Sequence, residues 1–383
     1  MVRRTSRWLL VVVALFTVAF VPVARAAVPA QPEGPLGYVP GYDDPPPAFP
    51  WQGSWKARAV TFPSLRTHAA LYATLFAPAR LPAGRLAAVV ILPGSTVGTQ
   101  ANYQWSARDL AGHGYVALTV DPQGQGHSQE IAVPPCQRAR SARGCGDLDQ
   151  PSYTSTANWE DALESGVDFL LSSGDPLRGK VDAYAIGAAG HSEGAGIVSY
   201  MQQVDHRIRA IVAWDNLNSS TTGDHGDANC TNQPTTPIRP EVPALGEASE
   251  TCIGSAKDPS PSYARDPNLK LPGFDDWRAH RMPTMEVVFA GTQHLDFGQS
   301  PYDDSGHVTG SETQLYEFEW FTRAWFDLWL RHEPSAYERL LPRSVGTATL
   351  GTVISSRYRS AAYLPGAHVD CADLRSCHPM ATR

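Results

Sequence analysis

The chain has 383 residues, of which 42% are hydrophobic, and its 31 basic and 38 acidic side chains give a formal charge of −7. Without the first 26 residues, which contain four arginines and no acids, the charge becomes −11. This balance argues against nucleic acid or an anionic membrane surface as the main partner. Beyond residue 26 no stretch of apolar residues is long enough to span a bilayer, so we expect no integral membrane segment in the mature chain.

Residues 1–26 have the features of a signal peptide. Three arginines precede an apolar run over residues 9–21, and the sequence ARA at residues 24–26 is a small-residue cleavage site. An uncleaved membrane anchor is the alternative, but the apolar run is short for a span. We therefore expect cleavage after Ala26 and a secreted protein, either extracellular or periplasmic.

All six cysteines follow the signal peptide and fall into three local pairs, Cys136 with Cys145, Cys230 with Cys252, and Cys371 with Cys377. In an oxidising compartment three short-range disulfide bonds are the simplest assignment, although sequence alone does not fix the connectivity. No Cys/His cluster has the spacing of a zinc site, so we expect no structural metal.

Strands and helices alternate along most of the remaining chain. Residues 27–54 are rich in proline and glycine and predict an extended lead-in. From residue 55 the segments KARAVTF, ALYATLFAP and RLAAVVILPG predict strands, and the last is continuously apolar, as in a strand covered on both faces. QWSARDLAGHG then predicts a helix and YVALTVD another buried strand.

The alternation continues into the second half. Residues 155–173 predict an amphipathic helix, KVDAYAIGAAG a strand, GAGIVSYMQQV a helix and IRAIVAWDN a strand. EVPALGEA is a weaker strand candidate, TMEVVFA a clear one, and residues 311–332 predict a closing helix. This order predicts β-α-β units in a mostly parallel sheet with helices on both faces. We expect one catalytic domain over residues 55–335 with loop insertions, and a tail over residues 336–383 packed on it.

A motif for nucleophilic catalysis lies between a predicted strand and a predicted helix. GHSEG at residues 190–194 fits the pattern G-x-S-x-G, in which a tight turn leaves room for almost no side chain beside the serine. An incidental serine in a glycine-rich turn is the alternative. The strand and helix around it favour Ser192 as a nucleophile.

With the segments VVILPG, DPQGQGHS, GHSEGAG and GTQHLDF, the chain resembles the α/β-hydrolase superfamily over about residues 55–332. It is most similar to secreted bacterial esterases and lipases of the dienelactone-hydrolase, platelet-activating-factor-acetylhydrolase and polyester-hydrolase branches. The resemblance implies an eight-stranded, mostly parallel sheet and a catalytic triad in the chain order serine, acid, histidine.

A serine hydroxyl needs a base, and imidazole is matched to that task near neutral pH. Of the 12 histidines, His294 in GTQHLDF stands just after the last strong strand, where the superfamily places its base. His191 adjoins Ser192 but is expected to point elsewhere.

The acid that orients the base is less well defined by the sequence. Asp215 ends the strand IVAWD and resembles the acid of the platelet-activating-factor-acetylhydrolase branch. Most relatives use an acid after the next strand, where this chain offers Glu247 and Glu250. We favour Asp215 over Glu250, and Asp296 lies too close to His294 in sequence.

Two backbone N–H groups should stabilise the oxyanion of the tetrahedral intermediate. One is that of Glu193, and the other comes from the turn after VVILPG, with Ser95 favoured over Thr96. The Glu193 carboxylate fits the first turn of a helix, where the macrodipole favours it; a sharper hypothesis is that its charge disfavours anionic substrates.

The remaining candidates concern the pocket. The turn DPQGQGHS at residues 121–128 is expected to shape its floor without reacting. Trp214 is the best-placed wall residue, and Tyr103 and Trp105 are either wall or core residues.

These features predict a secreted serine hydrolase that cleaves carboxylic esters through an acyl-enzyme. We expect it to be a monomer without a cofactor and to act on a small-molecule, lipid or polyester ester. The same triad could serve an amidase, peptidase or thioesterase, and a non-catalytic binding protein on this scaffold is a more remote alternative. The polar stretches 217–239 and 251–281 could form a lid, and the sequence does not define the acyl and alcohol groups of the substrate.

Overall fold

The computed structural model describes residues 55–95, 99–129, 156–172, 174–177, 179–215, 217–219, 237–251, 266–299 and 310–377. The expected signal peptide, the lead-in and the cysteine pairs 136–145 and 230–252 lie outside the described residues.

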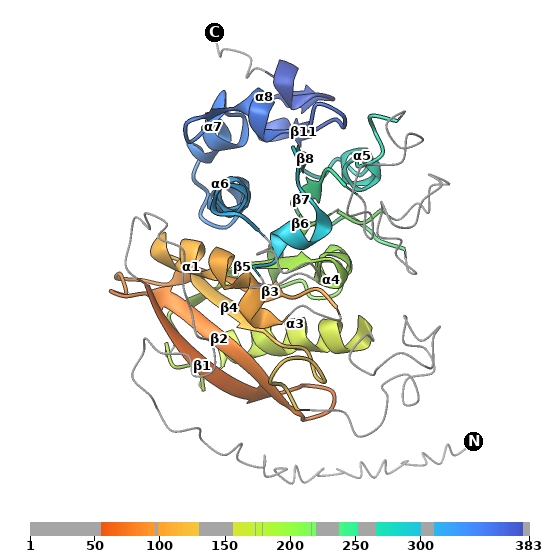
Figure 1. Cartoon of the computed structure of the whole chain (residues 1–383). Coiled ribbons are helices and arrows are strands. Elements are labelled where there is room, and N and C mark those ends of the chain that lie inside the picture. Colours follow the sequence, from red (N-terminus) through yellow and green to blue (C-terminus); the bar gives the residue numbers. More distant parts are fainter. Residues whose placement is uncertain are drawn as a thin grey trace, which may run out of the picture.

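A mixed sheet of ten strands forms the centre of this α/β fold (Figure 1). Its strand order is β1-β2-β4-β3-β5-β6-β7-β8-β11-β12. The six strands from β4 to β8 in this order are mutually parallel. An antiparallel pair flanks them on each side, with β2 and β11 running opposite to the central strands that they contact. The strands span β1 Trp55–Pro63, β2 Ala70–Pro78, β3 Leu86–Leu92, β4 Val116–Val120, β5 Val181–His191, β6 Ile208–Trp214, β7 Ala244–Ser249, β8 Thr284–Phe289, β11 Ala361–Leu364 and β12 Val369–Cys371.

The expectation of eight strands was wrong, because the C-terminal tail joins the sheet. β11 pairs antiparallel with the edge of β8, and β12 pairs with β11. An open sheet edge has unpaired N–H and C=O groups, which an added strand satisfies. Two further short strands, β9 (Ser344–Val345) and β10 (Ala348–Thr349), form a separate ladder.

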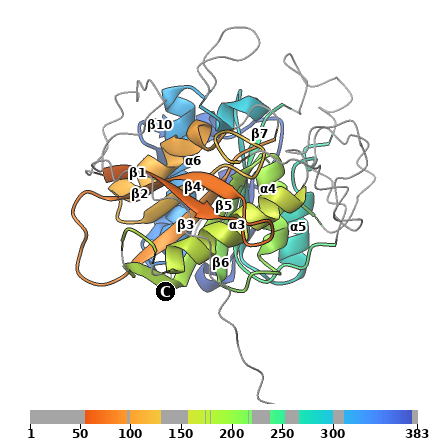
Figure 2. The ribbon, with the colours of Figure 1, turned by 90° about the horizontal axis from the view of Figure 1, so that it is seen from below.

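Helices cover both faces of the sheet, as expected. Figures 1 and 2 show α6 on one side of the strands and α3 on the other. The helices span α1 Gln104–Gly112, α3 Thr156–Leu171, α4 Glu193–Met201, α5 Pro272–Ala279, α6 Glu312–Trp329, α7 Ala336–Leu340 and α8 Leu350–Val353. Short 3-10 helices are η1 (Gln100–Tyr103), η4 (His294–Phe297), η5 (Pro365–Ala367) and η6 (Leu374–Ser376).

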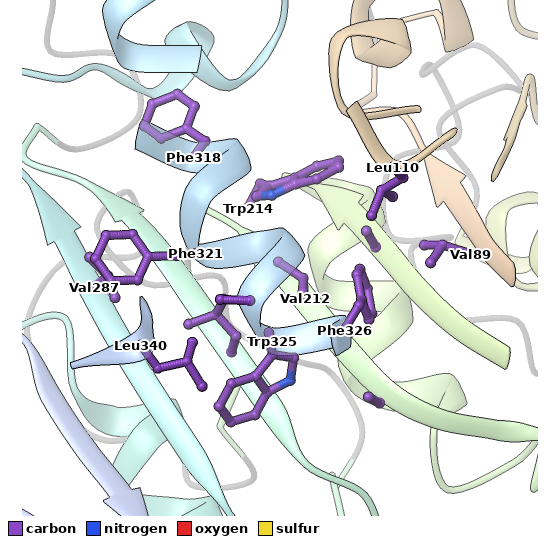
Figure 3. Close-up of a cluster of buried hydrophobic side chains, with 14 of the residues drawn as sticks. Val89, Leu110, Val212, Trp214, Val287, Phe318, Phe321, Trp325, Phe326 and Leu340 are labelled. Atoms are coloured by element: carbon purple, nitrogen blue, oxygen red, sulfur yellow. The ribbon is translucent and has the colours of Figure 1, made fainter. Parts of the chain in front are cut away.

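Side chains of the central strands alternate between two apolar cores. On β3, Val89 and Ile91 face the core shared with α1 and α6, whereas Val90 and Leu92 face the core shared with α3 and α4. Both sets are fully buried, which explains why the strand is a continuous apolar run. Figure 3 shows aromatic side chains of α6, including Phe318, beside residues of β6 and β8 in the first core.

The tail also contains the disulfide bond that the local spacing predicts, between Cys371 of β12 and Cys377 after η6. This bond is compatible with a secreted protein. Within the ranges that the structure describes, no helix is both long and apolar enough to cross a membrane.

Candidate active site

Ser192 occupies a strained turn between β5 and α4. Its backbone angles are φ 54° and ψ −113°, a conformation that non-glycine residues rarely adopt. A Cβ atom at Gly190 would lie 2.4 Å from the carbonyl oxygen of Gly194, and one at Gly194 would lie 2.8 Å from that of Pro93. Both positions therefore require glycine, and the turn is held tight by the close approach of α4 to the end of β5.

His294 contacts both Ser192 and Asp215. Its Nε2 atom lies 3.0 Å from the Ser192 hydroxyl oxygen, and its Nδ1 atom is hydrogen-bonded to Oδ2 of Asp215. The other carboxylate oxygen of Asp215 accepts hydrogen bonds from the backbone N–H and the hydroxyl of Ser249, at 2.9 and 2.8 Å. The three residues follow β5, β6 and β8, so the parallel strands bring their carboxyl ends to one edge of the sheet.

The Asp215 carboxylate is buried but remains in its charged form. Burial by itself would raise its pKa, but the Lys270 ammonium and the His294 ring outweigh that effect and hold the pKa well below the usual range. Lys270 is only 2% exposed, and burial lowers its own pKa. Asp215 is therefore an acceptor only at neutral pH, and the hydrogen atom in its bond to His294 belongs to Nδ1.

The other candidate acids have different partners. Glu250 accepts hydrogen bonds from the Ser355 hydroxyl at 2.6 Å and from the backbone N–H of Gly291 at 2.9 Å. Asp296 accepts from the backbone N–H of Gln293 at 2.8 Å. Glu247 lies fully buried on β7, and the resulting desolvation raises its pKa well above the usual value. Of the four acids weighed from the sequence, Asp215 is the one in contact with His294.

The turn after β3 passes directly beside Ser192. A Cβ atom at Gly94 would lie 3.2 Å from that of Ser192. Side chains from two other segments bind the carbonyl groups of this turn: Trp159 Nε1 donates to Pro93 and Gln125 Nε2 donates to Gly94, each at 2.9 Å. These bonds fix the turn that precedes Ser95, whereas Thr96 lies outside the described residues.

Glu193, the first residue of α4, has a half-buried side chain. Burial and the neighbouring Glu160 carboxylate raise its pKa to about 7. The position agrees with a carboxylate in the first turn of a helix. Because its charge changes near neutral pH, Glu193 would repel anions mainly in alkaline solution.

The turn at residues 121–128 is hydrogen-bonded to the loop after β3 and to η1. The buried carboxylate of Asp121 accepts hydrogen bonds from the backbone N–H groups of Gln100 at 2.7 Å and His127 at 3.0 Å, and burial raises its pKa to about 7. Gly126 has φ 56°, and a Cβ atom there would lie 2.1 Å from an Asp121 oxygen. Together with the bond from Gln125 to Gly94, these contacts hold the loop after β3 in place.

Trp214 lies in the core beneath the site rather than on an open wall. Its side chain is fully buried, and its Nε1 atom donates to the Thr322 hydroxyl at 3.1 Å. Its ring stacks on that of Tyr103 with centroids 6.2 Å apart and packs against Trp105 at 5.0 Å (Figure 3 shows Trp214 beside α6). The expected wall position therefore does not agree with its burial, because β6 directs this side chain toward α1 and α6. Tyr103 and Trp105 are core residues as well.

His191 has a closer relation to the site than its sequence position indicated. It was expected to point away from the elbow, yet its ring centroid lies 4.5 Å from that of His294. Its Nε2 atom is 2.9 Å from the His294 carbonyl oxygen, and its Nδ1 atom is 2.7 Å from the Tyr103 hydroxyl. The only sequence signal for this role is that His191 directly precedes the serine.

His191, Asp215 and His294 are also spaced closely enough to hold a metal ion, with potential ligand atoms within 4.8 Å of one another. The ring nitrogens of both histidines, however, already contact protein groups: Tyr103 and a backbone carbonyl for His191, and Asp215 and Ser192 for His294. The donor set therefore fits a proton relay better than a metal site.

No protein-family model matches the chain, and no curated protein is similar enough to count as a relative.

Proposed function

We propose that the protein is a secreted serine hydrolase that cleaves carboxylic esters through an acyl-enzyme, on an α/β-hydrolase fold. The observation that carries the proposal is the continuous contact from the Ser192 hydroxyl through His294 to Asp215. The chain order serine, acid, histidine and the strand-turn-helix position of Ser192 agree with it. So does the parallel centre of the sheet, with β11 and β12 as additions to strands β1 to β8.

His294 serves as the base. Since Nδ1 keeps its hydrogen atom and donates a hydrogen bond to Asp215, the lone pair of the neutral ring is at Nε2, which faces the Ser192 hydroxyl. Nε2 takes the hydroxyl proton as the oxygen attacks the ester carbonyl, and Asp215 stabilises the imidazolium that forms. The same proton then goes to the leaving alcohol. In the second half of the reaction Nε2 takes a proton from a water molecule that attacks the acyl-enzyme. The proton is then returned to the Ser192 oxygen, and the carboxylic acid is released.

The backbone N–H groups of Glu193 and Ser95 stabilise the oxyanion. Glu193 directly follows the nucleophile at the N-terminus of α4, whose dipole favours negative charge. Ser95 belongs to the turn that runs beside Ser192 and is fixed by Trp159 and Gln125. Donors that are already in position need little reorganisation when charge develops in the transition state.

The substrate that we propose is a small-molecule, lipid or polyester ester, and no cofactor takes part in these steps. The negative charge of the chain makes nucleic acid an unfavourable partner.

Substitution of the nucleophile tests the proposal. We expect Ser192→Ala to lower the turnover of p-nitrophenyl butyrate by about 10⁴-fold or more and to abolish labelling by a fluorophosphonate probe, with the circular dichroism spectrum unchanged. Ser172→Ala is the matched control, because that hydroxyl is exposed and binds only local backbone. Unchanged turnover in Ser192→Ala would refute the proposal. Parallel rates on a p-nitroanilide would show whether the site prefers amides.

A further inference from the structure

Three hydrogen bonds in series join the loop after β3, the end of β5 and the start of η4. The backbone N–H of Gly94 donates to the Tyr103 hydroxyl oxygen at 3.1 Å. The Tyr103 hydroxyl lies 2.7 Å from Nδ1 of His191, and Nε2 of His191 lies 2.9 Å from the carbonyl oxygen of His294. The side chains of Tyr103 and His191 are each 2% exposed, so water does not compete effectively for these bonds.

The direction of each bond follows from the donors and acceptors. The carbonyl oxygen of His294 can only accept, so Nε2 of His191 carries a hydrogen atom and donates it. In a neutral ring the lone pair is then at Nδ1, which accepts the hydroxyl hydrogen of Tyr103. The Tyr103 oxygen in turn accepts from Gly94. The donor and the acceptor of each bond are therefore fixed, and the series is complete only when both side chains are neutral.

Burial keeps both side chains in the forms that this arrangement needs. It lowers the pKa of His191 to about 3, with a further contribution from the nearby His294 ring, which outweighs the opposing effect of Asp215. Burial also raises the pKa of Tyr103 well above its usual value. The series is therefore uncharged across the pH range in which a serine hydrolase operates.

His191 connects the site to the central sheet. It is the last residue of β5 and lies opposite Trp214 of β6 in the parallel register. The residues at the other ends of the series belong to loops: Gly94 lies in the turn that supports Ser95, and His294 begins a short 3-10 helix. The bonds thus attach two loops of the site to a central strand at the position next to the nucleophile.

We propose that His191 is a positioning residue that, together with Tyr103, fixes the backbone of His294 and the turn at Gly94 relative to Ser192. The inference rests on the proposed function and extends it. His191 does not act on substrate: it holds the base and an oxyanion donor at the separations that proton transfer and charge stabilisation require. A displacement of about 1 Å at such groups can cost about 100-fold in rate.

Two substitutions that retain an aromatic ring break the series. His191→Phe retains a ring but leaves the His294 carbonyl and the Tyr103 hydroxyl without this partner, and Tyr103→Phe removes only the hydroxyl. We expect kcat for p-nitrophenyl butyrate to fall about 10- to 100-fold in His191→Phe, and less in Tyr103→Phe, with KM changed by less than about threefold. Because the bonds are in series, the double variant should resemble His191→Phe instead of showing the product of both losses.

Two further variants separate positioning from simple packing. In His191→Gln the side-chain amide can still donate to the His294 carbonyl, so we expect part of the lost kcat to return. His280→Phe is the control, because His280 also binds a backbone carbonyl, that of Asp276, at the end of α5. It should leave kcat unchanged.

Active-site titration with a fluorophosphonate completes the experiment, since it counts competent sites and reports the reactivity of Ser192 without substrate binding. If His191 and Tyr103 are positioning residues, the probe should titrate all Ser192 sites of the variants, but it should react with them more slowly than with the wild type. Wild-type kcat per titrated site in both His191→Phe and Tyr103→Phe would overturn the inference, as would a loss explained entirely by fewer folded sites. If the wild-type protein neither hydrolyses esters nor reacts with the probe, the proposed function itself fails, which is a distinct result.

Discussion

Replacement of Asp215 by asparagine should reverse the proton arrangement of His294. The oxygen that now faces Ser249 receives two hydrogen bonds, from its backbone N–H and its hydroxyl, so the amide oxygen of asparagine should take that place. The amide nitrogen then faces Nδ1 of His294 and donates to it. The ring proton moves to Nε2, which points at Ser192 and can no longer accept the hydroxyl proton.

The size of the effect follows from this exchange. Loss of the correct tautomer in a serine-histidine-aspartate triad lowers kcat by about 10⁴-fold, equivalent to about 5.5 kcal/mol of transition-state stabilisation. KM should change little, because neither Asp215 nor the tautomer of His294 contributes to ground-state binding of an ester. Initial rates with p-nitrophenyl butyrate and a thermal unfolding curve would measure both the loss and the integrity of the fold.

Glu250→Gln is the matched comparison. Its carboxylate binds Ser355 and the backbone of Gly291, so the substitution should weaken a bond worth roughly 1 kcal/mol and change turnover by less than about tenfold. A larger loss in Glu250→Gln than in Asp215→Asn would refute the assignment of the acid. So would an Asp215→Asn variant that keeps a substantial fraction of wild-type turnover.

Three further predictions concern stability. Above about pH 4.5, Glu247→Gln should have a higher free energy of unfolding than the wild type, by up to about 1.4 kcal/mol per pH unit, because burial raises the pKa of Glu247 in the folded state and its ionisation then favours the unfolded chain. Below about pH 4, urea titrations should find the two proteins equally stable, and a difference already present there would contradict this cause. Gly190→Ala should destabilise the fold and abolish activity, since the added Cβ would lie 2.4 Å from a carbonyl oxygen of α4. Gly112→Ala is the control, because a Cβ there has open space and should be tolerated. Normal ester turnover in Gly190→Ala would disprove the close contact. Replacing Cys371 and Cys377 by serine should cost about 2 kcal/mol in urea unfolding, and a variant as stable as the wild type would show that closing this short loop contributes nothing.

Much of the strand and helix pattern could be predicted from local sequence, because burial on both faces and amphipathic spacing each leave a periodic signal. The run at β3 and the capped start of α6 at Ser311 are examples. The sequence of β7 predicts a strand less clearly, because it contains Gly246 and Glu247. The adjacent strand β8 contains a buried acid, Glu286. A Cβ atom at Gly246 would lie 1.9 Å from the Glu286 carboxylate, so the glycine makes room for a buried acid on the adjacent strand. Such a pairing is not visible in either strand by itself.

The short strands β11 and β12 left no usable pattern, since three or four residues are too few to display a period. Their place at the edge of β8 depends on the exposed edge of that strand, which is a property of the assembled sheet. The burial of Trp214 also depends on the assembled fold. Its neighbours in sequence suggested a pocket wall, but α1 and α6 cover that face of β6.

The sequence by itself determined the residue types of the proposed hydrolytic site, their chain order and the glycine-flanked turn at Ser192, because these depend on short segments whose geometry is local. Only the tertiary structure decided which acid meets the base. Asp215 and Glu250 both follow parallel strands at the same edge of the sheet, and 79 residues separate Asp215 from His294. A positive φ of 62° and two hydrogen bonds from Ser249 orient Asp215, while Glu250 is turned toward Ser355. The same is true of His191, because its two partners, Tyr103 of η1 and His294 of η4, come together only when the strands are paired.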